Sequence, residues 1–135
     1  MTDFERSFRP TPDELSPARA ALRTWLGQVG VDAEATANVL IVTSELVTNG
    51  VFHDGGDLIT LRADRRNGDV SVEVTTVDHL PGQHPTYREV EEAEEGGRGL
   101  NIVHAFSHGY KVVTHDHERV TTCLVHAGSS IAAPH

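Results

Sequence analysis

The stretch Thr43-Ser-Glu-Leu-Val-Thr-Asn-Gly50 is the most informative part of this sequence, because it sets a carboxylate and an amide four residues apart. In a helix that spacing places Glu45 and Asn49 on one face, one turn from each other. His53 follows one further turn along the same face. A carboxylate can orient or deprotonate a nucleophile, and an amide oxygen can coordinate a hard cation such as Mg²⁺. This face is therefore a candidate wall of a metal and phosphate site.

The same stretch belongs to a segment that we predict to be one long helix, beginning near Asp32 or Glu34 and ending at His53. The segment contains no proline, and its apolar residues follow helical spacing around much of the circumference. Such a helix is expected to lie at the centre of the fold. β-branched residues at 39–43 leave a strand as the alternative for that part, and the length of the segment favours the helix.

A glycine-rich segment downstream, Gly96-Gly-Arg-Gly-Leu100, precedes an apolar run with helical spacing. The pattern predicts a helix from Arg98 to about Ser107. Glycines let backbone N–H groups approach phosphate oxygens, and a helix N-terminus favours negative charge. Together with Glu45 and Asn49, this segment suggests a nucleotide bound with a divalent metal.

A third segment, Asp78-His-Leu-Pro-Gly82, follows a predicted strand. Asp78 is in phase with Val74 and Thr76, so its carboxylate is expected on the packed face of the sheet. There it could accept a hydrogen bond from the exocyclic amine of adenine. The alternative is an aspartate that begins a turn, continued by Pro81 and Gly82.

The remaining elements predict an α+β fold. A helix opened by Ser16-Pro17 is expected to stop at Gly30, and Asn67-Gly68 is a strong hairpin signal. Hairpins together with helices favour a two-layer α/β sandwich, with a mixed, mostly antiparallel sheet and three helices on one face. The predicted parts are an arm or edge strand at 1–15, a domain at 16–126 and a flexible tail at 127–135. The predicted strands are 58–65, 69–77, 110–115 and 119–125, with a long acidic loop at 79–97.

Composition fits a single soluble domain in the cytoplasm. The chain has 135 residues and a formal net charge of −9, which disfavours direct binding to nucleic acid. No apolar run is long enough to span a membrane, and the N-terminus lacks a signal-peptide core. The single cysteine, Cys123, fits a reducing compartment, and its apolar neighbours favour a buried structural thiol.

Taken in this order, the three segments resemble the histidine-kinase-like ATPase domain, the Bergerat or GHKL fold shared by DNA gyrase and sensor kinases. They look closest to the small anti-sigma factor serine/threonine kinases of bacteria and their actinobacterial relatives. The resemblance covers roughly residues 16–126. It implies that Glu45 is the general base and that Asn49 binds Mg²⁺. The nucleotide-binding residues that it implies are Asn49, His53, Asp78, Gly82, Gly97, Arg98, Gly99, Leu100 and Thr121, with Thr122 as the alternative for the threonine near the adenine.

The adenine-binding segment departs from the pattern Asp-x-Gly-x-Gly of the family. Leu80 replaces the middle glycine, although Asp78 and Gly82 are kept. Alternatively, Thr76 could stand at the position of the family's aspartate, because a shift of two residues keeps the same face of the strand. In that alignment the carboxylate contact to adenine is lost.

The resemblance implies an ATP-binding regulator of the anti-sigma type that uses Mg²⁺ and phosphorylates a serine or threonine in a partner protein. The expected partners are a sigma factor or its antagonist, and a homodimer is also expected from the resemblance. The alternative is a binding module that kept the fold but lost efficient use of ATP. A plain ATPase, in which water replaces the serine, is a third hypothesis.

Overall fold

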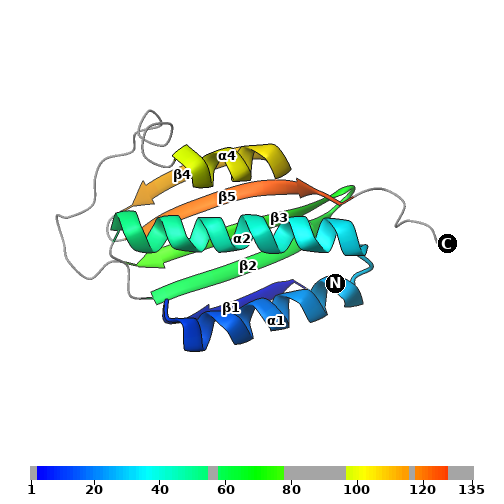
Figure 1. Cartoon of the computed structure of the whole chain (residues 1–135), viewed down its shortest axis with the longest axis horizontal. Coiled ribbons are helices and arrows are strands. Elements are labelled where there is room, and N and C mark those ends of the chain that lie inside the picture. Colours follow the sequence, from blue (N-terminus) through cyan, green and yellow to red (C-terminus); the bar gives the residue numbers. More distant parts are fainter. Residues whose placement is uncertain (1–2, 55–57, 78–96, 116–117, 128–135) are drawn as a thin grey trace.

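The computed structural model describes residues 3–54, 58–77, 97–115 and 118–127, and for 50–54 and 97–101 it describes the helical backbone alone (Figure 1). Strands and helices follow one another in a two-layer arrangement. The elements are β1 (Phe4–Phe8), α1 (Pro12–Gln28), α2 (Ala33–Asp54), β2 (Leu58–Arg66), β3 (Asp69–Val77), α4 (Gly97–Phe106), β4 (His108–His115) and β5 (Glu118–His126).

One five-stranded sheet has the order β1-β2-β3-β5-β4, and each of its four neighbouring pairs is antiparallel. The three described helices lie on one face of it, with α2 between α1 and α4 (Figure 1). The predicted α+β sandwich with a mostly antiparallel sheet is therefore confirmed. Residues 39–43 are helical, so the alternative of a strand there is wrong.

The N-terminal segment is an edge strand. Residues of β1 pair with β2 from Phe4 opposite Ala63 to Phe8 opposite Ile59. Phe8 is buried in the core, and the ring of Phe4 lies 6.0 Å from that of Trp25. These apolar contacts hold β1 against α1 and β2.

Helix α1 begins at Pro12, so the predicted start at Ser16-Pro17 is wrong. The backbone N–H of Glu14 donates to Thr11 Oγ1 at 3.3 Å, and Glu14 Oε1 in turn accepts from the N–H of Arg9 at 2.8 Å. Thr11 with Pro12 thus supplies the N-cap and the proline at the first helical position. The sequence contains two Ser/Thr-Pro signals for a helix start, Thr11-Pro12 and Ser16-Pro17. At the earlier one, Glu14 also accepts a hydrogen bond from the residue two positions before Thr11.

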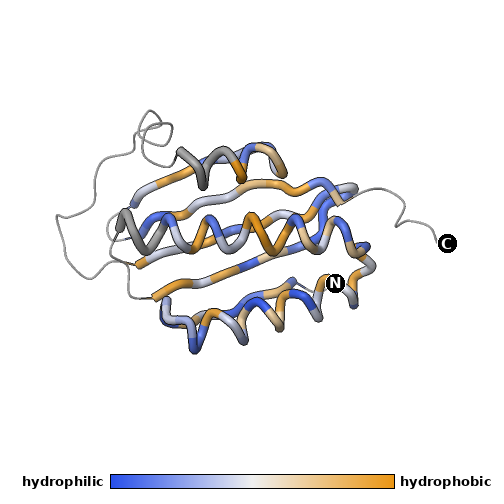
Figure 2. Tube along the Cα trace, viewed as in Figure 1, coloured by the Kyte–Doolittle hydropathy of each residue, from blue (hydrophilic) through white to orange (hydrophobic). Residues whose placement is uncertain are grey.

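The interior between α2 and the sheet is almost entirely apolar. Figure 2 shows apolar segments in the middle of α2 and along the strands behind it, alternating with polar ones. In β3 the residues Val70, Val72, Val74 and Thr76 share the buried face, as the alternation predicted. Burying one such aliphatic side chain contributes roughly 1.5–3 kcal/mol. This packing fixes the rotation of α2 about its axis. It therefore also fixes the direction of the polar stripe of α2, which is formed by Glu34, Asn38, Glu45 and Asn49.

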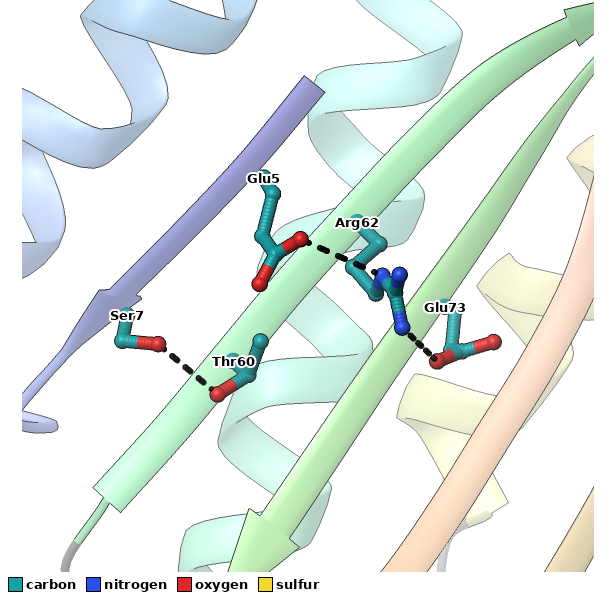
Figure 3. Close-up of polar contacts among 5 residues, drawn as sticks. All are labelled: Glu5, Ser7, Thr60, Arg62 and Glu73. Atoms are coloured by element: carbon teal, nitrogen blue, oxygen red, sulfur yellow. Dashed lines mark hydrogen bonds and ion pairs between the residues drawn. The ribbon is translucent and has the colours of Figure 1, made fainter. Parts of the chain in front are cut away.

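The other face of the sheet carries polar pairs between strands (Figure 3). Arg62 on β2 forms ion pairs with both neighbouring strands. Its Nε lies 3.6 Å from Oε1 of Glu5 on β1, and its Nη1 lies 3.9 Å from Oε2 of Glu73 on β3. Ser7 and Thr60 share a hydrogen bond of 2.9 Å. Such exposed ion pairs contribute little to stability individually, so the helix-covered face is the one that determines the fold.

The β2–β3 hairpin confirms the Asn67-Gly68 signal, because Asn67 has a φ of 47°. That left-handed conformation is tolerated by asparagine and is required by the tight hairpin turn. Within the described part of the chain, no helix combines the length and apolarity needed to cross a bilayer.

Candidate functional site

The polar stripe of α2 faces α4. Asn38 lines a pocket together with Ala105 and Phe106 at the end of α4. Asn49 lies eleven residues after Asn38, which is about three turns of helix and returns to the same side. Glu45 precedes Asn49 by one turn, and both side chains are half-buried. The carboxylate and the amide therefore lie on the side of α2 toward α4.

Helices α2 and α4 pack side by side and run in opposite directions (Figure 1). Phe106 at the end of α4 shares the pocket with residues 32–38 at the start of α2, and the start of α4 at Gly97 lies nine residues back, or about 13 Å. The same distance along α2 from residues 32–38 reaches positions 41–47. The first turn of α4 thus lies beside the turns of α2 that carry Glu45 and lead to Asn49, as the hypothesis of one shared site requires.

Residues 97–100 of the glycine-rich segment form the first turn of α4. The helix begins at Gly97, one residue before the predicted start, so Gly97, Arg98, Gly99 and Leu100 all have helical backbone. An α-helix leaves its first N–H groups without partners inside the helix. Next to Glu45 and Asn49, these N–H groups can bind an anion such as phosphate.

Two buried hydroxyl groups stand on the strands beneath these helices. Thr121 on β5 is 8% exposed and pairs with Val74 on β3. Thr76, which is 2% exposed, lies two residues after Val74 on the same face of β3. Of the described residues, only these two and Thr43 are both polar and buried. Thr121 therefore lies on the helix-covered side, as its predicted role near a base requires.

The remaining predicted site residues are not all covered by the structure. His53 lies in the last turn of α2, where the backbone alone is described. Asp78, Leu80 and Gly82 lie outside the described residues, so the choice between Thr76 and Asp78 as the adenine contact stays a prediction. Within the ranges that the structure covers, no group of three or more His, Cys, Asp or Glu is arranged to hold a metal ion.

Cys123 belongs to the core. It is a free thiol, 1% exposed, and burial raises its pKa to about 11, against the smaller opposite effect of a hydrogen bond with Ser107. A thiol with a raised pKa is a poor nucleophile. The predicted structural role of this cysteine is thus confirmed.

Sequence reasoning missed the pocket at the other end of α2, where Asn38 meets α4. One signal was available: Glu34 and Asn38 repeat the spacing of Glu45 and Asn49 eleven residues earlier. The repeat places a second acid and amide on the same stripe. Only the antiparallel packing of α4 shows which part of that helix each pair faces.

Comparison with known proteins supports the interpretation of the fold. A search of curated proteins gave no significant match. A sequence model of the histidine kinase-like ATPase domain matches residues 8–125, and it begins earlier than the predicted 16–126 because it includes the end of β1. The match spans most of the sequence and agrees with the sheet and helices described above. The chain belongs to the histidine kinase-like ATPase domain family, which implies a site for ATP.

Proposed function

We propose that this protein is a cytoplasmic regulator of the anti-sigma type that binds ATP with Mg²⁺ and phosphorylates a serine or threonine of a partner protein. The partner in this proposal is a sigma factor or an antagonist of the regulator. The proposal is supported above all by one observation, the juxtaposition of the Glu45–Asn49 stripe with the first turn of α4. The match to the ATPase family supports the choice of nucleotide.

Each residue of the stripe has a chemical task in this proposal. Glu45 accepts the proton of the attacking hydroxyl as the oxygen forms its bond to the γ-phosphorus and ADP leaves. Asn49 offers its amide oxygen to Mg²⁺, which typically takes few protein ligands and completes its shell with phosphate oxygens and water. The metal, when bound, offsets the charge of the phosphates.

The first turn of α4 binds the phosphates in the same proposal. Its N–H groups are free of partners within the helix, and the glycines at 97 and 99 leave the backbone accessible. Thr121, on the covered face of β5, borders the base. Binding at these places positions the γ-phosphate, which is the main requirement of phosphoryl transfer.

Calorimetric titration with Mg·ATP tests the proposal, using Asn49→Ala and the matched control Asn38→Ala. Both variants remove an amide from the same stripe of the same helix. We expect binding with a Kd at or below ~100 µM, which is about −5.5 kcal/mol. Asn49→Ala should remove the metal-dependent heat, and Asn38→Ala should leave it unchanged. Equal effects of the two variants would contradict a metal site at Asn49.

The second candidate function is a binding module that controls a sigma factor or another regulator without using ATP. It is favoured by the departure at the adenine segment, where Leu80 replaces a glycine and a threonine stands at position 76. Absence of heat at millimolar nucleotide, from a folded protein that still captures its partner, would support this function over the kinase.

A further inference from the structure

The pocket that Asn38 lines lies at the far end of the α2–α4 pair from Glu45 and Asn49. Its volume is about 370 Å³, and it is formed by the start of α2, the end of α4 and the adjoining ends of β4 and β5. Ligand pockets typically measure about 300–1,000 Å³. The space is therefore large enough for a side chain of another protein or for a small ligand.

The charge of this pocket favours a cation. Of the described residues that line it, Asp32 and Glu34 are carboxylates and none is lysine or arginine. His108 and His126 also line it. Nε2 of His108 lies 3.4 Å from Oδ2 of Asp69, and Nδ1 of His126 lies 3.6 Å from Oδ1 of the same carboxylate. A third carboxylate thus stands behind the histidines. Phosphate and carboxylate ligands would meet net repulsion here.

The helix ends around the pocket agree with this preference. The N-terminus of α2 alone would attract an anion, but Asp32 Oδ1 already accepts from the N–H of Ala35 at 2.8 Å. The opposite wall is the last turn of α4, which ends at Phe106. The final carbonyl groups of a helix carry partial negative charge and favour a cation.

Phe106 narrows the choice of cation. Phe106 is 38% exposed and lines the acidic pocket. A guanidinium or ammonium group is attracted to the face of an aromatic ring, and its aliphatic stem packs on apolar surface. A free inorganic cation would leave this ring uncovered, whereas an amino-acid side chain covers it.

We propose that this pocket binds an arginine or lysine side chain presented by a partner protein. Glu34 supplies the counter-charge, Asn38 a carbonyl acceptor and Phe106 the packing surface. The inference goes beyond the proposed function and does not depend on nucleotide, so it is tested without ATP. Failure of ATP binding at Asn49 would leave it unaffected.

The test is a titration of the ¹⁵N-labelled protein, followed by NMR, with four probes. They are acetyl-arginine-N-methylamide, its lysine and glutamine counterparts, and spermidine. We expect the arginine and lysine probes to shift the amides of residues 32–38 and 105–108 with millimolar Kd. The glutamine probe, which lacks the charge, should give no saturable shift.

Matched variants locate the effect. The pair Asp32→Asn and Glu34→Gln, introduced together, removes both charges, and asparagine can still cap α2. We expect it to weaken binding of the arginine probe about fivefold or more. Glu45→Gln, the same change eleven residues along the stripe, should leave binding intact. Absence of saturable shifts with arginine and lysine, or equal loss in both sets of variants, would overturn the proposal. Spermidine binding tenfold tighter than arginine would also overturn it, in favour of a free amine.

Discussion

Helix α2 carries the same pair of side chains at its two ends, Glu34 with Asn38 and Glu45 with Asn49, on one stripe. The two pairs differ in what faces them. Glu45 and Asn49 lie beside the start of α4, whose free N–H groups favour an anion, whereas Glu34 and Asn38 lie beside its end, whose carbonyl groups favour a cation. Identical side chains therefore acquire different chemistry from the direction of one neighbouring helix.

In the proposed kinase reaction, the largest expected difference between the two ends is in phosphoryl transfer. Glu45→Gln should lower the rate of transfer to the partner protein by about 10²–10⁴-fold, because it removes a general base. Glu34→Gln, at the other end of the same stripe, should change that rate less than about twofold. Single-turnover assays with γ-labelled ATP and each variant measure both values. Undiminished transfer in Glu45→Gln would exclude Glu45 as the base.

The next effect concerns the scaffold that holds both ends in place. Leu46 lies on the buried face of α2 and is 2% exposed, whereas Ile41 on the same helix is 38% exposed. Leu46→Ala should lower the free energy of unfolding by about 2–5 kcal/mol, since it leaves a cavity. Ile41→Ala should change it by no more than about 0.5 kcal/mol. Urea denaturation measures both, and a similar cost at the two positions would contradict the orientation of α2 on which the comparison rests.

The third prediction concerns the core beneath the start of α2, where the pocket lined by Glu34 and Asn38 favours a cation. Burial raises the pKa of Cys123 from 9.0 to about 11, and its thiol shares a hydrogen bond with Ser107, which lines the pocket. The raised pKa gives a contribution to stability that is present below pH 9.0 and is lost as pH rises toward 11, because the unfolded chain releases this proton first. The unfolding free energy of the wild type minus that of Cys123→Ala should therefore fall over this interval. A difference that stays constant with pH would mean that the thiol is solvated.

Much of the fold and part of the candidate site could be predicted from local sequence signals. The spacing of Glu45 and Asn49 required only that α2 be helical, and Asn67-Gly68 predicted the hairpin because asparagine tolerates the positive φ that this turn has at position 67. The start of α1 was predicted wrongly, because two Ser/Thr-Pro signals compete and the helix begins at the earlier one, where Thr11 supplies the N-cap and Glu14 accepts the N–H of Arg9. Local propensity alone does not rank such signals.

The direction of α4 relative to α2 could not be predicted, because it results from packing between residues far apart in sequence. The pocket beside Asn38 therefore stayed hidden, although the repeated glutamate and asparagine were visible. Burial of Thr76 followed from the alternation in β3, because strand parity is a local property. Signals within one element were thus sufficient to place the glutamates and asparagines on one side of α2. Contacts between elements were needed to show which end of α4 each pair faces.

The smallest expected effect separates charge from capping at the start of α2. Asp32 both lines the cation-favouring pocket and accepts the hydrogen bond of the Ala35 N–H. Asp32→Ala removes both roles and should lower the unfolding free energy by about 1 kcal/mol. Asp32→Asn keeps a capping oxygen and should cost only a few tenths of a kcal/mol, while it weakens binding of the arginine probe as the alanine variant does. Thermal unfolding and NMR titration of the two variants measure these effects separately. If Asp32→Asn bound the probe as well as the wild type, the negative charge of Asp32 would have no part in the pocket, and the two ends of α2 would differ through the termini of α4 alone.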